Sequence, residues 1–181
     1  GVGKEDLEQF EGMMGLPGGG GSAEDEPPTA LAVEESDSLV GAPAPAVKTS
    51  LLDGEDFDLA DHRGKVVVLD FWATWCGPCV RALPELMKAT SAFDEKEVVL
   101  VAVNQGEKPK QIKKFLKQKN WESLSVALDP QSAAGKSFRV EGIPQTVVID
   151  KRGVVRHVHV GFSPDIGSRL KREIQALLTK N

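Results

Sequence analysis

Cys76 and Cys79 are the only thiols in this chain of 181 residues, and Gly77 and Pro78 alone separate them. A short turn follows the apolar run that ends in DFW, and helical spacing begins after Cys76, so this cysteine is expected at a helix N-terminus. Unpaired backbone N–H groups and the positive end of the helix dipole stabilise a thiolate there and lower the cysteine pKa. Cys76 is therefore a candidate nucleophile near neutral pH.

Cys79 lies about one helical turn further on, on the same side of the helix. From there its thiol can attack a mixed disulfide on Cys76 and release the bound partner in reduced form. Pro78 stiffens the first turn, where a missing N–H costs little. The spacing thus predicts a reversible redox couple.

Zinc binding and a static disulfide are the simpler explanations of a CxxC pair. Tetrahedral zinc needs two further ligands, and the sequence holds no second CxxC or CxxH. A static disulfide across three residues closes too small a loop to stabilise the fold much. His157 and His159 could bind metal as an HxH pair, but no acid or cysteine is spaced in sequence to join them. A polar sheet face explains these histidines better, and neither a metal nor a cofactor is expected.

Apolar runs and helical spacing alternate from residue 46 onward. KVVVLDFW (65–72) and EVVLVAVN (97–104) are continuous β-branched runs, typical of strands buried on both faces. Further strands are expected at 123–129, 145–150 and 154–160, and helices at 79–93, 109–120, 132–140 and 165–178. This order predicts an α/β domain with a central mixed β-sheet flanked by helices.

The charge distribution divides the chain near residue 45. Residues 1–45 carry ten acids against one base, a net of −9, whereas residues 46–181 carry 21 bases and 17 acids, a net of +4. Residues 16–47 are rich in Gly, Pro, Ser and acids, which is typical of a flexible linker. We therefore expect a flexible segment over 1–45 and one domain over 46–181. The small positive balance does not indicate nucleic-acid binding.

Three motifs, GKVVVLDFWATWCGPC, VAVNQGE and VEGIPQTVVIDKRG, resemble the thioredoxin superfamily and, within it, the TlpA/ResA-type thiol-disulfide oxidoreductases. The resemblance spans residues 41–178. It implies a thioredoxin-like fold with an inserted helix-strand unit, here 107–129, and an enzyme in which Cys76 attacks protein disulfides and Cys79 resolves. The Gly-Pro dipeptide matches thioredoxin, whose potential is about −270 mV, and so favours a reductase over an oxidant.

The same resemblance assigns two residues outside the CGPC motif. Pro144 matches the family's cis-proline, which would present the backbone of Ile143 for strand-like pairing with a substrate. Asp70 matches the buried carboxylate of thioredoxin and could take the proton of Cys79, since burial raises a carboxyl pKa. Ala82 stands where many TlpA/ResA-type proteins carry a glutamate, which shifts the acid-base role to Asp70.

Candidate substrate contacts follow from these matches, although Trp75, like Trp72, is explained more simply by packing around the loop. Glu107 is a further candidate, because related sequences often carry an acid near the site; a solvated loop acid is the simpler reading. The candidate substrate contacts are Trp75, Gly77, Pro78, Ile143 and Pro144.

By resemblance, the partners are disulfide-containing protein substrates, such as the apocytochromes of cytochrome c maturation, and an upstream thiol reductant. The resemblance also implies an extracytoplasmic location, periplasmic or held by an N-terminal membrane anchor. Nothing in the sequence resembles an added dimerisation domain, so a monomer is expected.

Two other functions compete with disulfide exchange as explanations of the sequence. A thiol peroxidase of the peroxiredoxin type places a proline and a threonine ahead of its cysteine, whereas only Thr74 precedes Cys76. A metal-handling module of the Sco type needs CxxxC and a distal histidine, and the spacing here is CxxC. Dithiol-disulfide exchange fits both the residues and the spacing best.

Overall fold

The computed structural model describes residues 39–180. Its main feature is a five-stranded mixed sheet with the strand order β5-β4-β3-β6-β7. In that order the strands are β5 (Val126–Asp129), β4 (Val98–Gln105), β3 (Val66–Trp72), β6 (Gln145–Ile149) and β7 (Val155–Val160). All five coincide with predicted strand regions, although β4 ends one residue later and β5 begins three residues later than predicted.

Strand β3 forms the centre of the sheet, and all seven of its residues are buried. It pairs in parallel with β4, with Asp70 opposite Ala102, and antiparallel with β6, with Asp70 opposite Thr146. A strand buried on both faces needs apolar residues throughout rather than alternation, which is the reason for the continuous run in the sequence.

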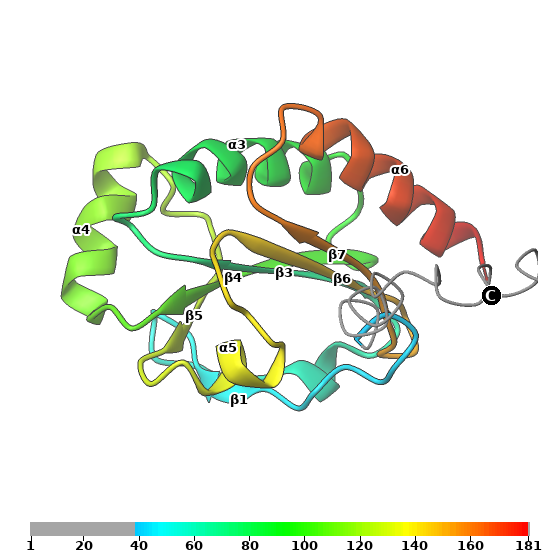
Figure 1. Cartoon of the computed structure of the whole chain (residues 1–181), viewed down its shortest axis with the longest axis horizontal. Coiled ribbons are helices and arrows are strands. Elements are labelled where there is room, and N and C mark those ends of the chain that lie inside the picture. The colour runs from blue at the N-terminus through cyan, green and yellow to red at the C-terminus, as the bar shows by residue number, and fades with distance from the viewer. Residues whose placement is uncertain (1–38, 181) are drawn as a thin grey trace, which may run out of the picture. The chain divides into compact units, whose positions relative to one another are not determined.

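Helices cover both faces of the sheet, as Figure 1 shows. Helices α3 (Gly77–Ser91) and α6 (Ile166–Thr179) lie on one face, and α5 (Ala133–Ser137) lies on the other. Helix α4 (Pro109–Lys119) buries Ile112 and Leu116 in the same core layer as α3. The prediction of a mixed sheet flanked by helices is confirmed.

The inserted helix-strand unit is also present. Helix α4 leaves the end of β4, and the chain returns to the sheet as β5, which pairs in parallel with β4. Two consecutive crossovers, through α3 and α4, therefore connect the three parallel strands, whereas β6 and β7 form an antiparallel hairpin.

The stretch before β3 contains structure that the sequence did not indicate. Strands β1 (Lys48–Ser50) and β2 (Asp56–Asp58) pair antiparallel, and the 3-10 helix η2 (Leu59–His62) follows. Three-residue strands are too short to show a period, which is why they were missed.

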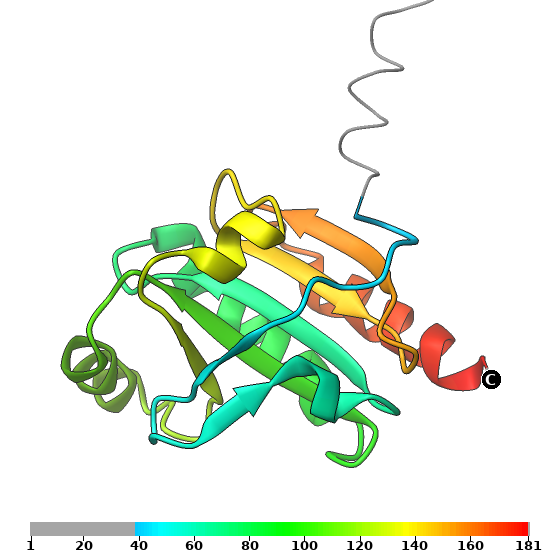
Figure 2. The ribbon, with the colours of Figure 1, turned by 90° about the horizontal axis from the view of Figure 1, so that it is seen from below.

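Residues 39–47 run along the sheet, which Figure 2 shows from below. Leu39 and Val47 are buried, and the Gly41 N–H donates to the Val155 carbonyl at 2.7 Å. Composition had assigned these residues to the linker. The acidic segment over residues 1–38 lies outside the described residues, so the division of the chain near residue 45 stays a prediction.

Candidate active site

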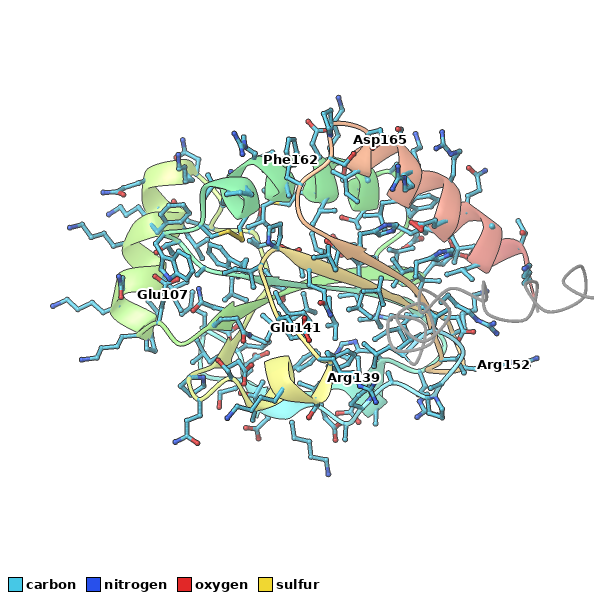
Figure 3. The ribbon with its side chains drawn as sticks, viewed as in Figure 1. Glu107, Arg139, Glu141, Arg152, Phe162 and Asp165 are labelled. Atoms are coloured by element: carbon cyan, nitrogen blue, oxygen red, sulfur yellow. A yellow bond between two sulfur atoms is a disulfide. The ribbon has the colours of Figure 1, made fainter. Side chains whose placement is uncertain are left out.

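The CGPC motif lies where β3 passes into α3, at the carboxyl end of the central strand. Cys76 is the N-cap of α3, and the Cys79 N–H lies 3.3 Å from the Cys76 Sγ. Pro78 occupies the first turn of the helix, as expected from its missing N–H. The two cysteines form a disulfide, visible in Figure 3 as the yellow bond at the start of α3.

The two sulfurs differ in access. Cys76 is 5% exposed, whereas Cys79, in the first turn of α3, is 0% exposed on the buried side of the helix. Gly77 and Pro78 are exposed above them. An incoming disulfide can therefore reach Cys76 first, which matches the predicted division into an attacking and a resolving cysteine.

The two tryptophans around the loop differ in burial. Trp72 is completely buried and its ring packs near Phe115, so it has the packing role that was expected. Trp75, in contrast, is 73% exposed, and the packing explanation fails for it. Its ring is a large apolar surface next to Cys76.

The loop before β6 brings Pro144 to the disulfide. The Ile143–Pro144 peptide bond is cis, and the Ile143 carbonyl oxygen lies 3.7 Å from the Cys76 Sγ. Gln145, which is buried, holds this loop by donating its side-chain N–H to the Phe138 carbonyl at 2.9 Å. Residues 67 apart in the chain thus meet at one point.

Asp70 is fully buried in the middle of β3. Strand alternation places its side chain on the same sheet face as Val68 and Trp72, the face covered by α3. The Thr146 hydroxyl donates to Oδ1 at 3.0 Å, and Oδ2 has no hydrogen-bond partner among residues 39–180. Burial raises the pKa of Asp70 to about 8, against which the hydrogen bond from Thr146 acts.

Glu107 supports the turn that carries Cys76. The backbone N–H of Thr74 donates to Glu107 Oε1 at 2.6 Å, and the Thr74 hydroxyl donates to Oε2. The Asn104 side chain donates to Oε1 at 2.9 Å. Glu107 is half-buried and lies at the α4 side in Figure 3, so it is not the solvated loop acid that served as the simpler explanation.

His157 and His159 on β7 both contact Glu173 on α6. The His157 Nδ1 lies 3.1 Å from Glu173 Oε2, and the His159 Nε2 lies 2.9 Å from the same oxygen. Spacing along the sequence did not indicate this acid, because it lies 14 residues beyond His159. Burial lowers the pKa of His157. Within residues 39–180, no group of three or more His, Cys, Asp or Glu side chains could hold a metal ion.

The structure brings most of the predicted site residues to one end of the sheet, and it adds three that sequence reasoning missed. Thr146 could have been found from the sequence, because it lies two residues after Pro144 in a predicted strand that pairs with β3. Thr74 and Asn104 carried no signal, because their importance depends on the path of the 104–107 turn. The three added residues are Thr74, Asn104 and Thr146.

Comparison with known proteins agrees with this geometry. Residues 39–174 match the family model described as Redoxin. The chain is 34% identical over 128 residues to the thiol-disulfide oxidoreductase ResA of Geobacillus thermodenitrificans (strain NG80-2), covering 71% of this chain and 73% of that protein. It is also 34% identical over 124 residues to the thioredoxin-like protein YneN of Bacillus subtilis (strain 168), covering 67% and 71%.

The chain belongs to the Redoxin family. Among solved structures, it resembles a protein assigned as the thiol:disulfide interchange protein DsbE from Chlorobium tepidum, with a TM-score of 0.71 and 37% identity, covering 77% of this chain and 97% of that one. The predicted thioredoxin-like fold and the TlpA/ResA resemblance are confirmed. This Redoxin-family chain is a thiol-disulfide oxidoreductase.

The buried carboxyl of Asp70 makes stability depend on pH. The folded protein keeps a proton that the unfolded chain loses near pH 3.8, so this contribution is complete below that pH and is lost as pH rises to about 8. We expect the free energy of unfolding of the oxidised wild type to fall by up to about 6 kcal/mol across this window relative to Asp70→Asn. Urea titration at each pH measures it, and parallel pH courses for the two proteins would contradict the raised pKa.

Both oxygens of the Glu107 carboxylate are expected to be needed as hydrogen-bond acceptors. Three donors converge on its two oxygens, so Glu107→Gln would set an amide N–H against the N–H and O–H groups of Thr74 or Asn104. We expect a loss of about 1–3 kcal/mol in the free energy of unfolding and slower exchange at Cys76. Glu95→Gln, at an exposed position, is the matched control. Equal stability and rate in both variants would show that Glu107 does not hold the turn.

Proposed function

We propose that this chain reduces disulfide bonds in other proteins, with Cys76 as the attacking thiol and Cys79 as the resolving thiol. The observation that carries the proposal is the unequal access of the two sulfurs at the N-terminus of α3. Cys76 is the N-cap of α3, and Cys79 is fully buried on the inward side of the same helix. A helix N-terminus stabilises a thiolate on the outer cysteine.

The reaction has two steps. The Cys76 thiolate attacks a substrate disulfide, forms a mixed disulfide and releases one substrate thiolate. Cys79, after losing its proton, attacks the Cys76 sulfur, so the mixed disulfide breaks, the second substrate thiolate leaves, and the Cys76–Cys79 disulfide forms. Two electrons pass to the substrate, and the protein ends in the oxidised form that the structure shows.

Asp70 is the proposed proton acceptor for Cys79. Both residues are 0% exposed; Cys79 belongs to the core cluster between α3 and the sheet, and strand alternation places Asp70 on the same face of the sheet. Among the described residues, the alternative site for an acid, three positions after Cys79, is the buried Ala82. Because the pKa of Asp70 is about 8, its ionised fraction increases as pH rises toward that value.

Substrate binding is proposed along the rim of the disulfide. The backbone of Ile143, held beside Cys76, would pair with an extended substrate segment, as an edge strand pairs. The exposed ring of Trp75 and the exposed Gly77 and Pro78 flank Cys76 in the chain and offer further contact surface. This arrangement suits a disulfide within a polypeptide.

The return to the dithiol requires an upstream thiol reductant, because each turnover oxidises Cys76 and Cys79, and the chain has no further cysteine to reduce them. We also propose an extracytoplasmic location, supported by the likeness to ResA. No helix within residues 39–180 is long and apolar enough to cross a bilayer.

The division of labour between the cysteines is tested by trapping. Cys79→Ser leaves Cys76 able to attack but removes the resolving step, so we expect mixed disulfides with protein substrates to accumulate. Cys76→Ser should form none, because Cys79 is sealed from solvent. Non-reducing gels with mass spectrometry report both. Accumulation in Cys76→Ser rather than Cys79→Ser would reverse the assignment.

The direction of transfer is tested by the reduction potential of the Cys76/Cys79 couple, measured in defined thiol buffers at pH 7. A reductase should have a value below about −230 mV, toward the thioredoxin end of the scale. A value above about −180 mV would instead indicate an oxidant or an isomerase.

A further inference from the structure

Thr146 donates its hydroxyl hydrogen to one oxygen of Asp70, and the other oxygen has no partner within residues 39–180. We propose that Thr146 is a positioning residue of thiol-disulfide exchange: its hydroxyl occupies Oδ1 and thereby reserves Oδ2 of Asp70 for the proton of Cys79. The inference rests on the proposed role of Asp70 as the proton acceptor.

The strand register sets this contact. Asp70 and Thr146 are direct partners in the antiparallel pairing of β3 with β6. Side chains opposite each other in such a pair project from the same face of the sheet, about 5 Å apart at Cβ. Threonine is β-branched and has few rotamers in a strand, so its hydroxyl is held in place. Thr146 is 2% exposed, and water cannot easily replace it.

The two carboxyl oxygens are therefore unequal. Oδ1 accepts a hydrogen bond of 3.0 Å, and this donor disfavours a proton on the same oxygen. Oδ2 is buried without a donor of its own among the described residues, so protonation there removes a buried charge without breaking a hydrogen bond. A proton taken from Cys79 is most stable on Oδ2.

Few ionisable groups face this carboxyl. On β4 its partner is Ala102, and α3 contributes Cys79 to the same core layer. His159 on β7 is the strand partner of Thr146 on its far side, and it is hydrogen-bonded to Glu173 on α6. The pKa of Asp70 depends on burial, which raises it, and on the Thr146 hydrogen bond, which lowers it. Thr146 is thus the side chain that favours the ionised form.

The proton step can be written in full. Asp70 as carboxylate takes the proton of the Cys79 thiol on Oδ2, and the Cys79 thiolate then attacks the Cys76 sulfur of the mixed disulfide. The bond between Cys76 and the substrate breaks, the Cys76–Cys79 bond forms, and the substrate leaves as a thiolate. When the disulfide is reduced again, Asp70 returns the proton to Cys79.

The test compares Thr146→Val, which keeps the shape and removes the hydroxyl, with Thr146→Ser, which keeps the hydroxyl. In the oxidised proteins the cysteines do not titrate, so the ¹³C shift of the Asp70 carboxyl gives its pKa directly. We expect the pKa to increase in Thr146→Val and to stay near the wild-type value in Thr146→Ser. The rate of disulfide closure at pH 7, followed by quenched flow, should fall about tenfold in Thr146→Val alone, as for loss of one hydrogen bond to a charged group.

The outcomes separate this inference from the proposed function. An unchanged Asp70 titration in Thr146→Val would overturn the positioning role, whatever the activity. If Asp70→Asn closes the disulfide as fast as the wild type, Asp70 is not the acceptor, and the catalytic part of the inference fails with it. The inference is supported if disulfide closure is slower in Thr146→Val, its rate-against-pH profile moves to higher pH, and Thr146→Ser restores both. A purely structural role would not move the profile.

Discussion

The pairing of β3 with a parallel strand on one side and an antiparallel strand on the other determines where every reacting group lies. The carboxyl end of β3 passes into α3 and places Cys76 at the start of that helix. Because β6 runs in the opposite direction, its first residues meet the same end of the sheet. The backbone of Ile143 and the sulfur of Cys76 therefore come together from distant parts of the chain.

The same pairing explains how one charged residue persists in an otherwise apolar strand. Asp70 is the only ionisable side chain of β3, and it lies in the most buried part of the sheet. Burying a carboxyl without full hydrogen bonding is unfavourable for the fold. A neutral residue of similar size would fit the strand with less penalty, so its presence there fits a chemical role better than a structural one.

The sequence predicted the central strands, the four helices and the positions of the two cysteines, because long apolar runs and helical spacing are strong local signals. It predicted Asp70 and Pro144 only through resemblance. The partners of Asp70 and Glu107 could not be predicted, because each depends on register or on the path of a turn. Thr146 becomes informative only when β6 is known to lie opposite β3. The exposed ring of Trp75 was misjudged, since burial of an aromatic residue is the usual outcome.

The long separation between β3 and β6 has a consequence for biosynthesis. Asp70 and Thr146 are 76 residues apart in the sequence, although they touch in the sheet. At about 5–20 residues per second, roughly 4 to 15 seconds of synthesis pass between them. For most of that interval both cysteines have been made, but β6, the antiparallel neighbour of β3, has not. The redox pair is therefore synthesised well before the strand that supplies the partner of Asp70.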